Sequence, residues 1–231
     1  MNEVLRQEKK FLISLDTYYQ LSHWVGQVIA EDSHNHGDGY AIRSLYFDSL
    51  DDRDYHEKMN GLELRRKIRL RNYGADSSFA MLEMKQKQGM MQKKRSLRMS
   101  KEDAQALIQR DYSVLLHYEE PFAAECYWMM HQYCYLPKAV IEYKRRAFIV
   151  EENSTRITFD HHIVGTESNF DIFSGGLLQN PLLNVHLVVM EVKFNGFLLG
   201  YVKDILRNAG TGELAVSKYC LGRAVSMHYR F

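Results

Sequence analysis

LRRKIRLRNYGADSSFAMLEMKQKQGMMQKKRSLR, residues 64–98, is the stretch that decides the fold, and its pattern predicts three consecutive strands. Eleven of its residues are Lys or Arg, and only two are acidic. Residues two apart in a strand point to the same side of a sheet. Arg69 and Arg71 therefore share a face, as do Glu83 and Lys85 on the next strand. Fixed cations on neighbouring strands suit a polyanion such as phosphate, so the function depends on whether this face looks into an enclosed site.

The composition predicts one globular domain, residues 1–231, with a substantial core, since 45% of the residues are hydrophobic. The net charge of +1 excludes a generally basic nucleic-acid binder, so we expect no nucleic-acid partner. Three scattered cysteines without a CxxC pair favour a reducing, cytoplasmic location. The N-terminal MNEVLRQEKK lacks the apolar run of a signal peptide, and no window approaches the roughly 20 apolar residues that span a bilayer.

The rest of the chain alternates groups of strands with helices. Further strands are predicted at Val4–Ser14, Tyr40–Asp48, Lys138–Glu152, Thr155–Phe159, His162–Thr166 and Val185–Phe194. Helices are predicted from an Asp16 cap to about Glu31, at Leu50–Asn60, after a Ser100 cap, at Glu119–Tyr133 and at Gly196–Ala209. Short turns favour antiparallel pairing, and roughly eight or nine strands are enough to close into a barrel.

A Glu-x-Lys pattern recurs inside four predicted strands, at Glu8/Lys10, Glu83/Lys85, Glu142/Lys144 and Glu191/Lys193. A single pair is best explained as a cross-strand ion pair on an exposed sheet, worth about 0.2–1 kcal/mol. The last pair lies in VVMEVKF, whose other face is apolar and should be covered by helices, so Glu191 and Lys193 should point to a polar interior. The set as a whole therefore favours a binding site over a solvated surface.

Nine segments in order resemble the VTC-type polyphosphate polymerase domain of the triphosphate tunnel superfamily. They are RQEKKF (6–11), YAIRSLYFD (40–48), KIRLRNY (67–73), LEMKQK (82–87), KKRS (93–96), IEYKRRAF (141–148), TRITFD (155–160), MEVKF (190–194) and ELAVSKYCLG (213–222). Each motif alone is weak, but the ordered set spans nearly the whole chain. The resemblance implies an α+β fold, in which eight antiparallel strands form a closed tunnel barrel with flanking helices.

The same resemblance implies the residues of the site, motif by motif. It gives catalytic roles to Lys10, Arg69, Arg71, Lys85, Arg145, Arg156 and Glu191, and substrate binding to Lys94, Lys193, Ser217 and Lys218. Glu191 is the expected ligand of Mn²⁺ or Mg²⁺, which prefer oxygen donors. Glu8 and Glu83 either assist Glu191 or only orient neighbouring cations, and both readings stay open.

Several residues have two interpretations. Arg145 matches the family spacing, but a register shift of one residue would turn Arg146 inward instead. His34 and His36 lie in a polar loop without a third metal ligand, so solvent exposure is the better interpretation. Four tyrosines are interpreted as packing residues, namely Tyr40, Tyr46, Tyr55 and Tyr219, and three cations as solvated, namely Lys9, Arg66 and Lys67.

We therefore expect a metal-dependent polyphosphate polymerase, which transfers the γ-phosphoryl group of ATP to a growing polyphosphate chain. A tripolyphosphatase or nucleoside triphosphatase would use the same residues with a water in line, and a non-catalytic polyphosphate-binding module would use them without turnover. The expected partners are ATP and polyphosphate or triphosphate. Coupling to a membrane would require a partner protein, and the sequence specifies no oligomeric state.

Overall fold

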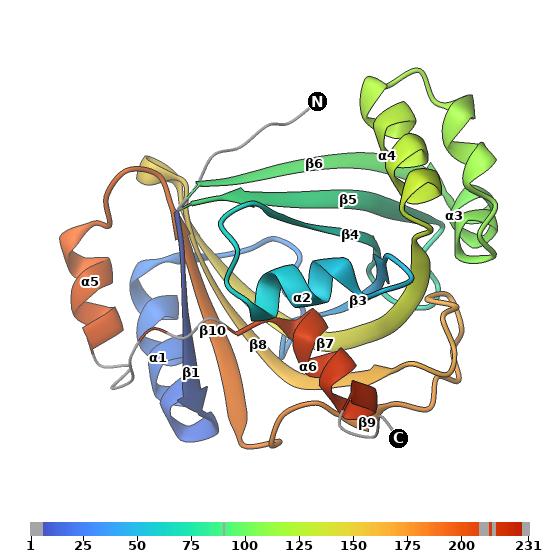
Figure 1. Cartoon of the computed structure of the whole chain (residues 1–231). Helices are drawn as coiled ribbons and strands as arrows, with labels where there is room; N and C mark the ends of the chain where they lie inside the picture. The colour runs from blue at the N-terminus through green and yellow to red at the C-terminus, as the bar shows by residue number, and fades with distance from the viewer. Residues whose placement is uncertain (1–6, 90, 208–212, 214–215, 228–231) are drawn as a thin grey trace.

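The chain folds into one strongly curled antiparallel sheet with helices on its outer side and at its open side, as the computed structural model shows (Figure 1). The structure describes residues 7–89, 91–207, 213 and 216–227. Its eight main strands follow the order β1-β10-β8-β7-β3-β4-β5-β6. The two-residue strands β2 (Ala30–Glu31) and β9 (Asn180–Pro181) pair with β7 and β8.

The prediction of three strands over residues 64–98 is confirmed. They are β4 (Arg65–Asn72), β5 (Phe79–Gln88) and β6 (Met91–Ser100). In the observed register Arg69 lies opposite Glu83, and Lys85 lies opposite Lys94. The alternate residues, Ile68, Leu70, Leu82 and Met84, are fully buried in an outer core. The alternation of the sequence therefore separates an apolar outer face from a charged inner face.

The second wall of the sheet contains β1 (Gln7–Ser14), β10 (Leu187–Phe194), β8 (Thr155–Thr166) and β7 (Leu136–Val150), and β3 (Tyr40–Asp48) joins it to the first. The two strands predicted within residues 155–166 are one strand. His162 interrupts its regular pattern with a φ of 50°, and the pairing register shifts between Glu142 and Lys144 on the neighbouring strand. A bulge of this kind bends a strand without ending it.

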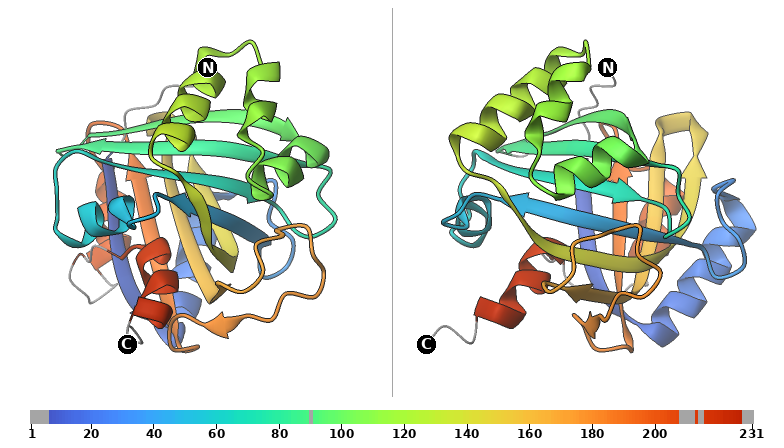
Figure 2. Two further views of the ribbon diagram at one scale, coloured as in Figure 1. Left: turned by 45° about the vertical axis from the view of Figure 1, so that its right-hand side comes forward. Right: turned by 90° about the vertical axis from the view of Figure 1, so that its right-hand side faces the viewer.

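Helices cover the outer faces of both walls (Figure 2). On one wall lie α1 (Leu15–Val28) and α5 (Gly200–Arg207), and on the other lie α3 (Lys101–Ile108), the 3₁₀ helix η1 (Tyr112–His117) and α4 (Pro121–Gln132). The short helices α2 (Arg53–Met59) and α6 (Lys218–Met227) lie at the open side, and η2 (Glu151–Asn153) links β7 to β8. Two hydrophobic cores therefore lie outside the sheet, and a third packs α6 against part of the inner face, whose remainder is polar.

Local hydrogen bonds explain where two of the helices begin. The Ser100 side chain accepts a bond from the Asp103 backbone N–H at 3.0 Å, as the predicted cap requires. The first helix begins earlier than expected, because Ser14 and not Asp16 is its cap and accepts from the Thr17 N–H at 3.1 Å. This helix also ends at Val28, before the predicted end near Glu31, because the chain turns into strand β2.

The curled antiparallel sheet forms a half-barrel, and the predicted full closure is not seen among the described residues. Its edge strands β1 and β6 come within 7 Å of each other, but no ladder joins them among the described residues. An isolated antiparallel bridge connects Phe11 of β1 to Glu213 instead. At this position the edge of β1 is therefore paired with Glu213. Across the described ranges, no helix combines the length and the apolar character needed to cross a membrane.

Candidate functional site

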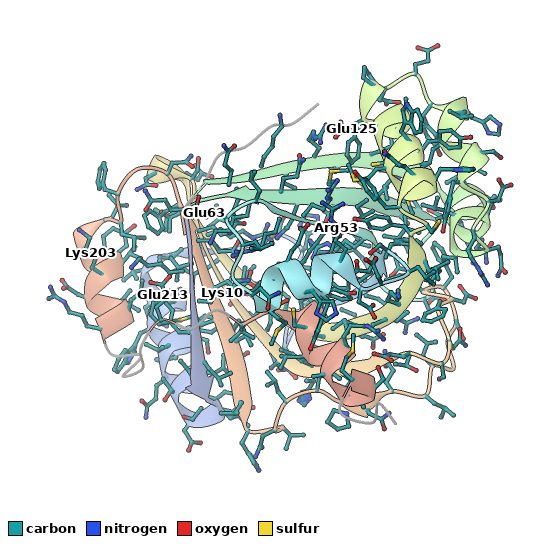
Figure 3. All side chains as sticks on the ribbon, viewed as in Figure 1. Lys10, Arg53, Glu63, Glu125, Lys203 and Glu213 are labelled. Atoms are coloured by element: carbon teal, nitrogen blue, oxygen red, sulfur yellow. The ribbon has the colours of Figure 1, made fainter. Side chains whose placement is uncertain are left out.

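The inner face of the half-barrel lines a cavity of about 560 Å³. Its walls carry seven lysines, five arginines and three glutamates, although the whole chain has a net charge of only +1. Lys10 illustrates the arrangement, since its side chain lies on the open side of the sheet while Lys203 lies on the outer helix α5 (Figure 3). Positive charge is therefore concentrated in one enclosed place, which is the property expected of a polyanion site.

Glu191 is the carboxylate on which the cations of one wall converge. Its oxygens lie 3.1 Å from the Lys193 ammonium, 3.2 Å from that of Lys218 and 3.6 Å from that of Lys10. Burial alone would raise the pKa of the Glu191 carboxyl, but these lysines and Arg145 hold it well below its usual value. The side chain is therefore ionised throughout the physiological pH range, as a metal ligand must be.

A second buried carboxylate, Asp160, holds two of the same cations in place. Arg145 donates two hydrogen bonds to it at 2.6 and 2.7 Å, and the Lys218 ammonium lies 2.6 Å away. Burial raises the pKa of Asp160, but Arg145 and Lys218 lower it by more. Sequence reasoning missed this residue, although its even spacing from Arg156 in TRITFD indicated the inner face.

Glu83, on the other wall, differs from Glu191 because cations surround its carboxylate on all sides that the contacts show. Arg69 donates to one of its oxygens at 2.6 and 2.8 Å, Lys94 pairs with the other, and only 2% of the residue is exposed. Burial would raise the pKa of this carboxyl, but Arg69, Arg71 and Lys94 hold it well below its usual value. Glu83 is not one of the residues that line the cavity, so its position fits the orientation of Arg69 and Lys94 better than binding of a metal.

Glu8 and Glu191 are the carboxylates that fit a divalent metal. They come from the paired strands β1 and β10, both line the cavity, and both lie near the Lys10 ammonium, at 2.8 and 3.6 Å. Lys10 and Lys193 outweigh burial and lower the pKa of Glu8 to about 2. No cluster of three or more His, Cys, Asp or Glu side chains suited to a metal occurs in the described part of the chain. Two carboxylates completed by phosphate oxygens and water are the usual donor set for Mg²⁺.

The structure brings most of the predicted residues to this cavity. The predicted residues that line it are Glu8, Lys10, Arg69, Arg71, Lys85, Arg145, Glu191, Lys193, Ser217 and Lys218. Arg146 points away and pairs with Glu31 on the other face of the sheet, so the register is the one that turns Arg145 inward. Glu142 and Lys144 lie on that outer face, so this Glu-x-Lys pair does not belong to the inner face of the sheet.

Two predicted residues, Lys94 and Arg156, do not line the cavity. Lys94 extends across the inner face to Glu83. Arg156 donates to Asp32 at 2.7 Å and to the Tyr40 hydroxyl at 2.8 Å. The sequence register does place both on the inner side of their strands, but their partners hold them away from the enclosed volume.

The cavity also contains residues that sequence reasoning interpreted as solvated or as packing. Lys67 and Arg66 both line it, as do the tyrosines Tyr46 and Tyr219. For Lys67 the signal was present, since its spacing places it on the same face as Arg69. Tyr46 accepts a hydrogen bond from Arg69 at 3.0 Å, so it orients a cation in addition to packing.

The buried Asp48 carboxylate fixes both helices of the open side. It accepts hydrogen bonds from the backbone N–H groups of Asp54 and Tyr55 in α2, at 2.8 and 2.9 Å. It also accepts one from the Tyr219 hydroxyl of α6 at 2.5 Å. Burial raises the pKa of Asp48 despite these bonds. The position of Lys218, next to Tyr219, therefore depends on the end of β3.

Comparison with known proteins gives one family and one fold. The profile of the family described as VTC domain matches residues 5–227. No curated protein matches the chain. Among solved structures, a proposed adenylate cyclase from Bacillus halodurans is similar with a TM-score of 0.53 at 14% identity, covering 94% of this chain and 96% of that one.

Two further solved structures share the fold with similar TM-scores and similarly low sequence identity. A proposed adenylyl cyclase from Hippeastrum gives a TM-score of 0.55 at 12% identity, over 95% of this chain and 96% of its own. A proposed adenylate cyclase from Vibrio parahaemolyticus gives 0.51 at 11% identity, over 94% and 97%. Identities this low establish the common fold and leave the activity to be argued from the site.

Proposed function

The chain belongs to the VTC domain family, and from that premise we propose that it is a metal-dependent polyphosphate polymerase that uses ATP as the phosphoryl donor. The observation that carries the proposal is the cavity itself, in which twelve Lys and Arg side chains face three Glu. Neighbouring phosphates of a polyphosphate repel one another strongly in a region of low dielectric constant. Only a wall with a large excess of fixed cations can hold such a chain.

In the proposed reaction, an oxygen of the terminal phosphate of the chain attacks the γ-phosphorus of ATP. The bond between that phosphorus and the β,γ-bridging oxygen breaks, and ADP leaves. Phosphoryl transfer depends mainly on positioning and on stabilisation of charge. Arg69, Arg71 and Arg145 present planar guanidinium groups suited to bidentate phosphate contacts, and lysines such as Lys10 and Lys218 supply point charges.

Carboxylates of the protein already hold the phosphate-binding cations in position. Asp160 holds the Arg145 guanidinium by two hydrogen bonds, and Glu83 holds that of Arg69 by two more. A bound Mn²⁺ or Mg²⁺ would be held by Glu191, with Glu8 beside it, and would neutralise charge on the transferred phosphoryl group. The cations on each wall are thus fixed by a buried carboxylate before any substrate enters.

A second candidate is hydrolysis of a triphosphate by the same residues. The Hippeastrum protein that shares this fold has a dominant triphosphatase activity. In that reaction a water, and not a phosphate oxygen, would attack the terminal phosphorus. The cavity supports both reactions, because its residues hold the phosphates and do not determine the nucleophile.

The test is to incubate the purified protein with ATP and Mn²⁺, and to separate long polyphosphate from free phosphate. We expect long chains and ADP in a one-to-one relation between phosphate incorporated and ADP released. Free phosphate without chains would identify a hydrolase. Tight polyphosphate binding without turnover of ATP would identify a binding module and contradict the polymerase proposal.

A further inference from the structure

Lys67 is a cation of the cavity wall, and no carboxylate among the described residues pairs with it. Its ammonium donates to the Ser217 hydroxyl at 2.6 Å and lies 5.7 Å from the centre of the Tyr219 ring. It forms no ion pair with any residue that the structure describes. An ammonium group has three donors, so at least two remain for a ligand. In this respect Lys67 differs from Lys10 and Lys218, which both lie against carboxylates.

A second ammonium group, that of Lys58, faces the same cavity from helix α2. Burial, with Lys10 and Lys58 adding to it, lowers the pKa of Lys67. Burial and the neighbouring Arg65 lower the pKa of Lys58. Both half-buried ammonium groups therefore have cationic neighbours that disfavour their charged form, and a bound anion would favour it.

The position of Lys67 along its strand defines what this ligand would be. The inward residues of β4 are Arg65, Lys67, Arg69 and Arg71. Inward neighbours on a strand are about 7 Å apart. Lys67 is therefore the next cation after Arg69 toward the side where α2 and α6 meet the sheet. A condensed phosphate gripped by Arg69 has to extend along the wall to reach it.

We propose that Lys67, with Lys58 and the Ser217 hydroxyl, forms an outer phosphate subsite that takes one more phosphate of a condensed phosphate already held at Arg69. This inference rests on the proposed function in one respect only, namely that the cavity holds condensed phosphates. The three groups come from β4, α2 and the start of α6. A phosphate at this subsite would therefore connect the wall of the half-barrel to both helices of its open side.

The experiment measures calorimetric affinity for orthophosphate, pyrophosphate and tripolyphosphate, in the unaltered chain and in Lys67→Met. We expect orthophosphate affinity to be unchanged and tripolyphosphate affinity to fall about tenfold or more, as loss of one charge-assisted hydrogen bond predicts. Lys58→Met should show the same trend with a smaller loss. Lys144→Met is the matched control, because Lys144 is exposed on the outer face of β7, and it should change neither affinity.

The possible outcomes separate failure of the subsite from failure of the proposed function. Equal tripolyphosphate affinity in Lys67→Met and the unaltered chain would overturn the subsite and leave the proposed function intact. Equal losses for orthophosphate and tripolyphosphate would also overturn it, because the effect would not depend on chain length. An unaltered chain that binds no tripolyphosphate would overturn the proposed function together with the subsite. Lys67→Gln, which keeps a hydrogen-bond donor, provides a second variant if Lys67→Met does not fold.

Discussion

Glu83 and Glu191 occupy the same Glu-x-Lys pattern on the two walls of the half-barrel, yet their surroundings differ. Both are nearly fully buried, and cations hold the pKa of each well below its usual value. Arg69 lies directly opposite Glu83 in the strand register and covers it. Glu191 instead lies between Lys10 and Thr158 on its neighbouring strands, and it lines the cavity. The pattern determines which face a carboxylate occupies, and the residue on the next strand determines whether a ligand can reach it.

The largest effect that tests this comparison is on turnover. Glu191→Gln removes the proposed metal carboxylate, and a metal supplies several kcal/mol of transition-state stabilisation. We expect kcat to fall by roughly a thousandfold in the assay with ATP and Mn²⁺, while polyphosphate affinity stays the same or increases, since the variant leaves more unbalanced cations. Glu142→Gln is the matched control, because it has the same pattern but pairs with Arg43 on the outer face. Full activity of Glu191→Gln would show that the metal assignment is wrong.

The corresponding substitution on the other wall should act on stability. Glu83→Gln leaves the buried Arg69 guanidinium without its partner, which typically costs about 3–5 kcal/mol in the free energy of unfolding. Urea denaturation would measure it. Glu31→Gln, whose partner Arg146 lies on the outer face, should cost below about 1 kcal/mol, because both side chains are partly exposed. If Glu83→Gln abolished the dependence on metal without destabilising the protein, Glu83 would be a metal ligand.

A third test compares two arginines, Arg69 and Arg156. The family resemblance gives both the same role in holding phosphate, but the structure places them differently. Arg69 lines the cavity, whereas Arg156 is held at 2.7 Å from Asp32 and does not. Arg69→Ala should weaken polyphosphate binding about tenfold or more, and Arg156→Ala less than about threefold, in calorimetric titrations. A larger loss in Arg156→Ala would mean that Arg156 leaves Asp32 when polyphosphate binds. Unchanged affinity in Arg69→Ala would contradict the assignment of the cavity.

The sequence predicted the inner face of this fold better than it predicted the site. Strand alternation correctly separated Arg69 and Lys85 from Leu70 and Met84, because side-chain direction in a strand depends only on parity. It could not show that Glu83 is covered, since that depends on cross-strand register. Nor could it show what pairs with the edge of β1. Phe11 is bridged there to Glu213, about two hundred positions away in the chain, and no local pattern predicts such a contact.

Helix-borne groups were harder to predict for a related reason. Lys58 lines the cavity from α2, whose start donates hydrogen bonds to Asp48, and the Tyr219 hydroxyl donates to the same carboxylate. No periodicity in the sequence connects these positions. The Lys67 side chain was predictable from parity, but its surroundings in the sequence, with Arg65 and Arg66 before it, resembled a solvated charge run.

The smallest predicted effect is the uptake of protons when a polyanion binds, and it involves Lys85 of the first wall. Burial, with Arg69 added, holds the pKa of Lys85 well below its usual value, and Glu8 offsets this only in part. A bound polyanion favours the charged ammonium and raises that pKa, so binding takes up protons at pH values above the lowered pKa. Affinity should therefore decrease as the pH rises through that range. Glu8 does not compensate, because its own pKa is about 2 and it stays ionised.

Titrations in two buffers with different ionisation enthalpies should show net proton uptake in the unaltered chain and less in Lys85→Met. Equal uptake in both would place the titrating group elsewhere in the cavity, with Lys67 the next candidate because burial lowers its pKa as well.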